Sequence, residues 1–477
     1  MTITHDLAVL VPELMLAVGS MAALLLGAWR GNGSTGGISI GMALLMAVAA
    51  VLVVIGPETG AFHGAFVMDG FARFADVIIL MCGAFVLLMA QSFFTVEKHV
   101  RFEMPVLIAL STLGMMLMVS ASNFIALYLG LELHSLALYV LAAFNRDNAR
   151  SSEAGLKYFV LGALSSGLLL YGISLIYGFT GTMDFAAITG IVKASGIGVG
   201  LVFGLVFLIA GLAFKLSAVP FHMWAPDVYE GAPTPITAFI ATASKVAALV
   251  TTIRAILVPF PDAMHQWQQV IIAVSVLSMA LGAVAAIGQE NIKRLMAYSS
   301  IGHMGYALLG LVAGTVSGVK AMLFYLAFYA VTNIGVFVCI QAMRRDGVAV
   351  EKISDLAGLA RTRPRLAFAF SALMLSLAGI PPLAGIFPKI YVFLSVVQAH
   401  QYVLAAFGFI ATCVGAYYYL RVAKVIYFDE PAKPFDKDAG WGMAGILTFA
   451  TAFTVLFVFM PWPLINQAAL AAQALFR

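Results

Sequence analysis

Fourteen long apolar segments follow one another along the 477-residue chain, and they constrain its fold more than any other feature. A membrane-spanning helix needs about 20 apolar residues, because the hydrocarbon core is about 30 Å thick. Only 10% of the residues are charged, whereas soluble domains have about 25%. We therefore predict an all-α, polytopic membrane protein with spans at 7–29, 36–55, 72–92, 104–120, 122–143, 155–177, 197–219, 235–257, 269–288, 294–313, 318–341, 366–397, 402–426 and 441–462.

The basic residues lie mainly on one side of the predicted bundle. Of the 26 lysines and arginines, 18 lie in loops that follow odd-numbered spans, 5 lie on the other side and 3 lie inside spans. Lysine and arginine concentrate in the cytoplasmic loops of membrane proteins. The bias therefore predicts that both termini lie outside the cytoplasm, and it supports the span count, because one missed span would mix the two sets.

Two short sequences indicate an internal duplication. Leu216–Phe221 in the seventh span resembles Leu377–Pro382 in the twelfth, and each lies late in a long apolar run. Paired spans interrupted by glycine or proline are typical of inverted-repeat transporters, and an offset of five spans inverts the second copy. We expect a single membrane domain over 1–477, with three N-terminal helices in 7–92, a first five-helix repeat over 104–257, a second over 269–426 and a last helix at 441–462.

Prolines interrupt both of these spans. Pro220 in the seventh span, and Pro381 with Pro382 in the twelfth, lack the backbone N–H of a helix interior and clash with the preceding turn. Unwound backbone at membrane depth is tolerated only inside protein or beside a wet cavity. We therefore predict that helices seven and twelve are discontinuous and that the breaks face the protein interior. A simple packing kink is the alternative at each site.

Four ionisable residues lie inside the predicted spans. Glu132 is midway along the fifth, Lys215 is at the break of the seventh, Lys245 is in the middle of the eighth, and Lys389 follows the break of the twelfth. A charge at the bilayer centre costs about 2.5–3.5 kcal/mol on insertion scales, so we interpret these residues as functional. The alternative is that the lysines snorkel to the interface, which works near helix ends and suits Lys245 least.

A histidine in the tenth span, His303, is a further candidate, although a lone helical histidine can equally be a satisfied core residue. A desolvated lysine loses its proton more readily, and a nearby carboxylate reverses this. Such groups can therefore switch charge and carry protons. Cys82, Cys339 and Cys413 are scattered without a C-x-x-C pair, which argues against thiol-ligated iron–sulfur or zinc sites. We expect proton movement without redox chemistry in this chain.

Three motifs resemble the antiporter-like membrane subunits of respiratory complex I over nearly the whole chain. They are Leu129–Leu133 (LGLEL), Phe221–Pro235 (FHMWAPDVYEGAPTP) and Gly379–Gly385 (GIPPLAG), the last followed by Lys389. The form of the second motif is most similar to the subunit N group of bacterial NADH-quinone oxidoreductases, the counterpart of mitochondrial subunit 2. The resemblance implies a proton-translocating role for Glu132 and the three lysines.

The resemblance also implies what this chain does not contain. NADH, flavin, iron–sulfur clusters and quinone would be handled by other subunits, so no cofactor and no metal is expected here. The partners would be other membrane and peripheral subunits and lipid, with no nucleic acid. The location would be the bacterial inner membrane, multi-pass, with both termini periplasmic. One departure is Pro388, where a small residue such as glycine is expected, and it leaves the geometry around Lys389 open.

Two other functions remain open at this point. A subunit of a multisubunit sodium/proton antiporter would share the fold and the lysines, and its companion subunits would distinguish it. A membrane scaffold for a quinone-reducing enzyme would not pump, and neutralising its buried charges would be harmless.

The charge bias makes a topology prediction. Reporter fusions at Asn148, Asp227 and Asp355 should give a cytoplasmic signal, and fusions at Glu58 and Asp262 a periplasmic one, because these positions lie on opposite sides of the fourteen-span arrangement. Paired alkaline phosphatase and fluorescent protein fusions measure this directly. A cytoplasmic signal at Asp262 would contradict the arrangement.

Overall fold

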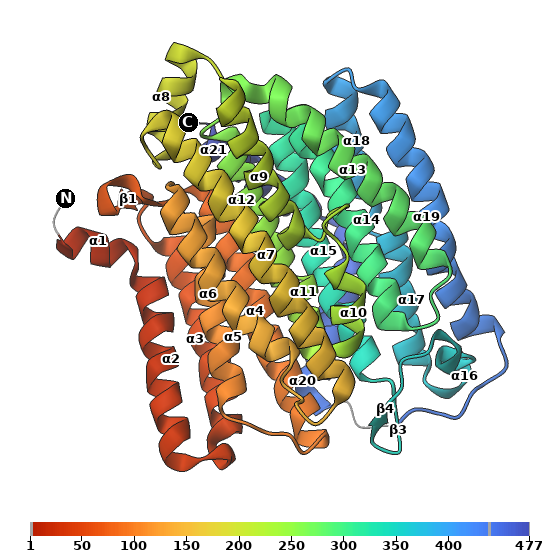
Figure 1. Ribbon diagram of the computed structural model, residues 1–477. Helices are drawn as coiled ribbons and strands as arrows, with labels where there is room; N and C mark the ends of the chain where they lie inside the picture. Colours follow the sequence, from red (N-terminus) through yellow and green to blue (C-terminus); the bar gives the residue numbers. More distant parts are fainter. Residues whose placement is uncertain (1–2, 437–439, 477) are drawn as a thin grey trace.

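The computed structural model describes residues 3–436 and 440–476, which form a bundle of long helices packed side by side (Figure 1). Both ends of the chain lie toward the upper end of the bundle in this view. The long helices and the segments of broken spans are α2 (Val11–Arg30), α3 (Thr35–Ile55), α4 (Gly70–Val96), α5 (Glu103–Val119), α6 (Phe124–Ala142), α7 (Ala149–Thr180), α9 (Val199–Leu216), α11 (Thr234–Ala241), α12 (Ala243–Leu257), α13 (Met264–Ile287), α14 (Ile292–Ala313), α15 (Val316–Gln341), α17 (Pro364–Ala378), α18 (Ile386–Gln398), α19 (Tyr402–Phe428) and α20 (Gly440–Leu456).

Shorter elements connect or follow these helices. The helices are α1 (Ile3–Val9), α8 (Phe185–Ser195), α10 (Trp224–Gly231), α16 (Leu359–Thr362) and α21 (Trp462–Leu475). Two antiparallel hairpins pair β1 (Thr59–Ala61) with β2 (Phe66–Met68) and β3 (Arg344–Arg345) with β4 (Val348–Ala349). The all-α membrane architecture predicted from the sequence is confirmed.

Among the described residues, twelve helices are long and apolar enough to cross a membrane, taking α11 with α12 as one. The other two predicted spans correspond to the 17-residue α5 and to the interrupted pair α17 and α18. The count of fourteen and the inverted repeat stay predictions. The last predicted span, 441–462, corresponds to α20 and the 3-10 turn Phe457–Phe459 that follows it, and α21 begins after Pro461.

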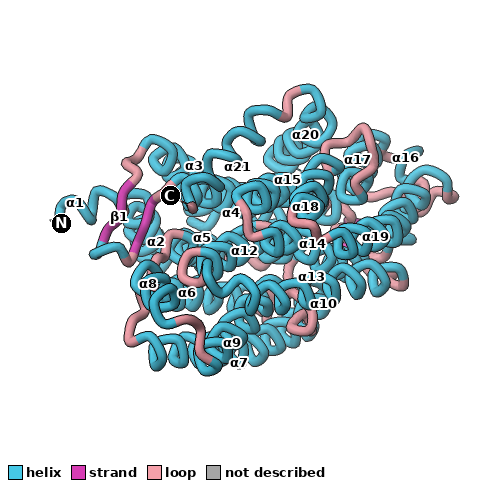
Figure 2. Tube along the Cα trace, turned by 90° about the horizontal axis from the view of Figure 1, so that it is seen from above, coloured by secondary structure: helices cyan, strands magenta, loops and turns pink. Residues whose placement is uncertain are grey.

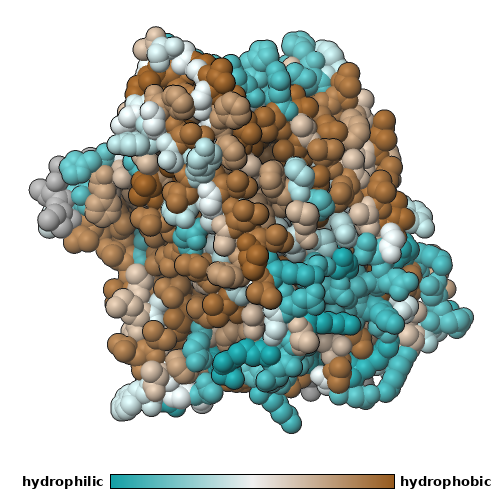
Figure 3. All heavy atoms as spheres, viewed as in Figure 1, coloured by the Kyte–Doolittle hydropathy of each residue, from teal (hydrophilic) through white to brown (hydrophobic). Residues whose placement is uncertain are grey.

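The centre of the bundle is formed by α4, α12, α14 and α15, which the other helices surround (Figure 2). The most apolar stretch of the α11–α12 span is 100% buried and those of α14 and α15 are 94% buried, against 28% for α2. The exterior is apolar over most of the height seen in Figure 3, and hydrophilic residues gather toward the end that carries β3, β4 and α16. Lys245 and Arg254 on α12 and Lys293 on α14 therefore lie inside the protein.

Both predicted breaks are present. Helix α9 ends at Leu216, and Ser217 adopts a left-handed conformation with φ 56°. Helix α17 ends at Ala378, and Gly379 adopts φ 83°. The Val219–Pro220 and Pro381–Pro382 peptide bonds are cis. The chain thus leaves the helical conformation just before each proline motif. The helix ends at Leu216 and Ala378 are buried, but Pro220, Pro381 and Pro382 are exposed. The prediction that the breaks face the interior is therefore correct for the helix ends and wrong for the prolines.

A third break was not predicted. The eighth span divides into α11 and α12 at Thr242, whose φ of −117° and ψ of −83° are not helical. No glycine or proline marks this position in the sequence. The Thr242 hydroxyl donates to the Ala238 carbonyl at 2.7 Å. A side chain therefore supplies a hydrogen bond to a backbone carbonyl at the break. Lys245 follows three residues later, in the first turn of α12.

Helices α5 and α6 cross so closely that their backbones are in contact at a glycine. A Cβ added at Gly114 would lie 2.4 Å from the backbone nitrogen of His134. A similar crossing joins α13 to α14, where a Cβ at Gly282 would lie 2.6 Å from the nitrogen of Gly302. Small residues permit such approaches between membrane helices. Both halves of the chain therefore contain helix pairs in backbone contact, and α7 with α9 is another, since a Cβ at Gly172 would lie 2.6 Å from the nitrogen of Leu208.

This contact predicts the effect of a methyl group. Gly114→Ala should lower the melting temperature of the purified complex, because the neighbouring atoms are backbone and cannot move aside alone. Gly167→Ala on α7 is the matched control: nothing lies within 4 Å of its added Cβ, and alanine favours a helix by about 0.5–1 kcal/mol over glycine. An unchanged melting temperature for Gly114→Ala would show that α5 and α6 separate freely.

Candidate functional site

Lys215 lies at the end of α9 with its ammonium group directed at one face of α6. Its Nζ donates to the Ser135 hydroxyl at 2.8 Å and the Tyr139 hydroxyl at 3.3 Å. Glu132 lies on the same face of α6, because residues three and seven positions apart align along a helix. The two charges interact electrostatically, but no ion pair joins them within the described residues, and Glu132 Oε1 has no hydrogen-bond partner. Lys215 thus binds hydroxyls one and two turns away from the carboxylate.

Lys245 is fully buried and binds the unwound end of α9. Its Nζ donates to the Lys215 carbonyl oxygen at 3.1 Å and also to the Ser217 hydroxyl. The last carbonyls of a helix lack partners within the helix and carry partial negative charge. The ammonium group also lies 4.9 Å from the centroid of the Trp224 ring, within cation–π range. The break in α9 therefore supplies the polar environment that Lys245 needs.

His134 does not share the face of α6 that carries Glu132. Its Nδ1 is 2.9 Å from the Ser111 hydroxyl on α5, and its Nε2 is 3.0 Å from the Ser244 hydroxyl on α12. Both ring nitrogens are therefore satisfied by neutral groups. His134 on α6 therefore links α5 and α12 by hydrogen bonds, and its partner on α12 is the residue next to Lys245.

Helix α10 connects the two halves of the buried network. Trp224, which lies against Lys245, and Tyr229 are both fully buried on this short helix. The Tyr229 hydroxyl donates to Ser300 on α14 at 3.3 Å, and the Tyr329 hydroxyl on α15 donates to the same oxygen at 2.8 Å. The network thus continues from α12 through α10 to α14 and α15.

His303 lies on α14 between two tyrosine hydroxyls. Its Nδ1 is 2.6 Å from the hydroxyl of Tyr325, and its Nε2 is 2.9 Å from the hydroxyl of Tyr419. The Tyr419 hydroxyl also meets Ser299 at 2.5 Å. Either ring nitrogen can donate or accept, depending on the tautomer. These contacts satisfy a core histidine and equally form a chain of groups that can exchange protons.

Lys389 on α18 binds the broken end of α17, as Lys245 binds that of α9. Its Nζ donates to the Ala378 carbonyl at 2.8 Å and lies 5.2 Å from the centroid of the Tyr306 ring. A cavity of about 20 Å³ has both His303 and Lys389 in its wall. The two residues therefore share a cavity wall, and both ring nitrogens of His303 are already engaged by tyrosine hydroxyls. Lys215, Lys245 and Lys389 are called the buried lysine row below.

The unexpected proline beside this lysine fits the structure. Pro388 lies in the first turn of α18, where a helix has no internal use for the N–H that proline lacks. It lines the same cavity as Lys389. The departure from the expected small residue therefore leaves the lysine in contact with its carbonyl acceptor.

Surface ion pairs anchor α10 outside the membrane-spanning segments. Asp227 accepts hydrogen bonds from Lys157 on α7 and Arg294 on α14, each at 2.7 Å, and Arg294 also donates to Glu230 at 3.1 Å. Burial alone would raise the pKa of Asp227, but the two cations outweigh burial and lower this pKa. The anchor is therefore intact at neutral pH and is lost only as the pH falls through the lowered pKa.

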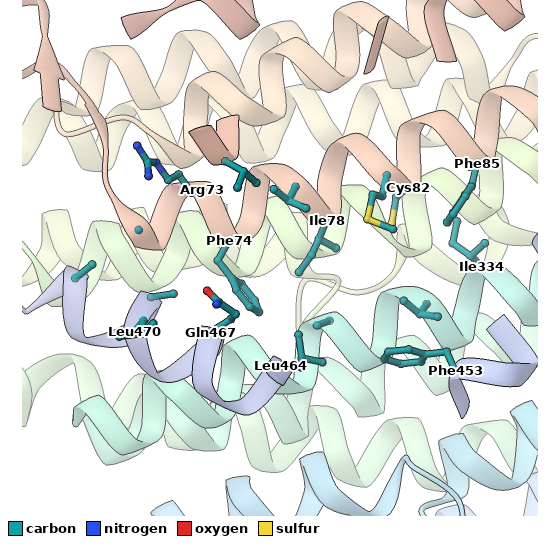
Figure 4. Close-up of a pocket in the computed structure, with 18 of the residues that line it drawn as sticks. Arg73, Phe74, Ile78, Cys82, Phe85, Ile334, Phe453, Leu464, Gln467 and Leu470 are labelled. Carbon is teal, nitrogen blue, oxygen red and sulfur yellow. The ribbon is translucent and has the colours of Figure 1, made fainter. Parts of the chain in front are cut away.

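A separate apolar cleft of about 640 Å³ lies between α4, α15, α20 and α21 (Figure 4). Arg73 lies at one end, and apolar side chains such as Ile78, Phe85 and Phe453 line the rest. No residue of the buried lysine row lines it. Across the described residues, no three His, Cys, Asp or Glu side chains gather as metal ligands would, and the absence of a cofactor stays an expectation.

The structure brings Lys215 together with Lys245, and His303 with Lys389, and it places Glu132 one turn from Ser135, the hydroxyl partner of Lys215. The sequence reasoning missed the aromatic partners: Trp224, Tyr229, Tyr306, Tyr325, Tyr329 and Tyr419. A signal for them existed, because a tyrosine in the middle of an apolar span needs a partner for its hydroxyl.

Comparison with known proteins gives consistent results. The family described as "NADH:quinone oxidoreductase/Mrp antiporter, TM" matches residues 121–415. The NADH-quinone oxidoreductase subunit N of Parvibaculum lavamentivorans is 54% identical, over 97% of this chain and 96% of its own. A chain of respiratory complex I from Thermus thermophilus with bound aureothin is 31% identical, with a TM-score of 0.82, and covers 96% of this chain and 99% of its own.

A chain of the Mrp complex from Dietzia sp. superimposes with a TM-score of 0.85 at 21% identity, over 100% of this chain and 98% of its own. That identity shows a shared fold only, so the sodium/proton antiporter alternative is not favoured over the relative at 54%. A full-length relative at that identity decides between the two. The chain belongs to the NADH-quinone oxidoreductase subunit N family, the antiporter-like, proton-pumping membrane subunits of respiratory complex I.

Proposed function

We propose that this chain conducts protons along the buried lysine row, with Glu132 and His303 as further proton-carrying residues. The observation that carries the proposal is the nature of the lysines' partners. All three ammonium groups are held by hydroxyls and backbone carbonyls, and none by a carboxylate. A carboxylate would hold the charge in place, whereas neutral acceptors let a desolvated ammonium release its proton when its surroundings change.

The first half of the path is a switch between Glu132 and Lys215. In the structure Lys215 binds Ser135, which lies three residues from Glu132 on the same face of α6. Three residues correspond to about 4.5 Å along a helix axis, a distance that a flexible lysine side chain covers without moving the backbone. Paired with Glu132 the ammonium keeps its proton, and bound to Ser135 it can release it.

The two lysines at the break of α9 act on each other. The Lys245 ammonium binds the backbone carbonyl of Lys215, and the charges of the two side chains repel. Interacting groups of this kind gain and lose protons as a pair. When Lys215 moves toward Glu132, its charge moves away from Lys245, which favours protonation of Lys245. When Lys215 moves back to Ser135, its charge again repels that of Lys245, which favours release of the proton from Lys245 to the next group.

The second half of the path runs through α14 and α18. The Ser300 hydroxyl joins Tyr229 to Tyr329, and the small cavity joins His303 to Lys389. Hydroxyls and an imidazole are groups that pass protons on. In this proposal the first inverted repeat loads protons and the second completes the passage.

The remaining parts of the proposal concern the whole complex. The redox chemistry of NADH, flavin, iron–sulfur clusters and quinone belongs to other subunits, and this chain contributes no cofactor. Both termini lie in the periplasm, as the basic loops predict. The redox subunits act on the row through electric charge or through movement of neighbouring helices.

Lys245→Ala tests the row as a whole. The variant should lower NADH-driven proton pumping by about tenfold or more, which is the scale of a lost proton-transfer group, while the complex still assembles. Lys320→Ala is the matched control, because Lys320 also lies over an aromatic ring, that of Tyr391, but outside the row. Pumping into vesicles and NADH oxidation with an artificial acceptor measure function and assembly. Unchanged pumping would favour the scaffold alternative.

Lys215→Arg separates a titrating role from a purely ionic one. Arginine keeps its charge but does not deprotonate in proteins, so it should fail about as completely as Lys215→Ala if Lys215 must release a proton. If the lysine only neutralises Glu132, the arginine variant should keep most of its pumping. Proton uptake in membrane vesicles decides between these outcomes, with acceptor-linked NADH oxidation as the assembly control.

A further inference from the structure

Two buried carboxyl groups lie among the N-terminal helices, outside the buried lysine row. Glu13 on α2 is 2% exposed and Asp76 on α4 is 0% exposed. None of their four carboxyl oxygens has a hydrogen-bond partner in the described part of the chain. A buried carboxylate with no donor is among the costliest groups in a protein, and it avoids that cost by binding a proton. The sequence reasoning passed over both residues.

The charges around Asp76 come from α2, from α12 and from the start of α4 itself. Glu13 and Asp69, the N-cap residue of α4, repel a charge on Asp76, and Arg254 on α12 attracts it. Arg254 is already engaged, since its Nη2 donates to Asp69 at 2.7 Å. Its Nε, however, is buried and has no partner. Asp6 on α1 is a further buried carboxyl at this end of the bundle.

The register between α4 and α12 gives the depth of Asp76. The Cys82 side chain on α4 contacts the Thr242 hydroxyl at the start of α12, and Asp69 meets Arg254 near the end of α12. The two helices therefore run in opposite directions along these stretches. Asp76 lies seven residues after Asp69, which corresponds to about 10.5 Å along the axis of α4. The part of α12 at the same depth lies within about one helical turn of Lys245.

Polar groups continue from this depth to the surface. The Thr251 hydroxyl on α12 is buried without a partner, and it lies between Lys245 and Arg254 in the sequence. The hydrogen-bonded pair of Asp69 and Arg254 follows, near the end of α12 and at the start of α4. Glu13 is in the first turn of α2. Buried polar groups thus extend from the level of Lys245 to the end of the bundle that carries the chain termini.

We propose that Glu13 and Asp76 form a shared proton-binding site that connects the buried lysine row with the surface beside Asp69 and Arg254. A proton that arrives from the row forms an O–H bond on one carboxylate oxygen, and that bond breaks when the proton leaves toward the surface. No electrons move. The inference rests on the proposed function of the row, and it assigns the N-terminal helices α2 and α4 a part in proton passage.

Asp76→Asn tests this site in the purified whole complex, reconstituted in vesicles. The amide resembles the neutral carboxyl in shape, so assembly should survive, while proton pumping should fall by about tenfold or more because the group can no longer bind and release a proton. Asp76→Glu should restore most of the pumping. If Asp76 only fills space, the Asn variant will pump as the wild type does, and the proposal fails.

Two further variants complete the test. Glu13→Gln should lower pumping in the same way, and it carries the test by itself if Asp76→Asn lowers the yield of complex. Ser39→Ala on α3 is the matched control, since that hydroxyl is also buried without a partner but cannot take part in proton binding at neutral pH; its pumping should not change.

Lys245→Ala in the same vesicles separates the two proposals. Loss of pumping in Lys245→Ala with normal pumping in both carboxyl variants would overturn the carboxyl site and leave the lysine row standing. Normal pumping in all three would overturn both. Loss of pumping in all three variants, with pumping restored in Asp76→Glu, supports both the lysine row and the carboxyl site.

Discussion

The hydrogen bond from Lys245 to the end of α9 is the interaction on which the rest of the site depends. The ammonium group of Lys245 in the fully buried α12 is shielded from solvent, and no carboxylate among the described residues pairs with it. The helix break solves this problem, because a terminated helix presents carbonyl oxygens that have no internal partner. Lys389 uses the same solution at the end of α17. The broken helices are therefore the means by which this protein keeps lysines at membrane depth.

The sequence predicted the elements that depend on local chemistry. The apolar runs located the long helices, and Pro220 and Pro381 located the two breaks. The break at Thr242 escaped prediction because no glycine or proline marks it in the sequence. Short helices such as α10 and α21 escaped as well, since each is too short to be recognised by the length of its apolar run.

The candidate site was predictable residue by residue but not as an assembly. Charged residues within apolar runs identified Glu132 and the three lysines, because their insertion cost is visible in the sequence. Their hydroxyl and carbonyl partners come from other helices, and one sequence does not contain that pairing. Glu13 was overlooked because it lies near the start of the first span, and Asp76 because it follows Arg73 near the start of the third.

Helix α10 has a consequence for the coupling of surface and interior. One end of this helix places Trp224 on the ammonium group of Lys245, and three residues later Asp227 is held by Lys157 and Arg294 at the surface. A rigid helical turn thus spans the distance between an aqueous ion-pair cluster and a dehydrated cation. Because the ion pairs and the indole ring belong to one turn of the same helix, the cluster in the aqueous phase and the cation in the membrane interior are mechanically linked without any charge crossing between them.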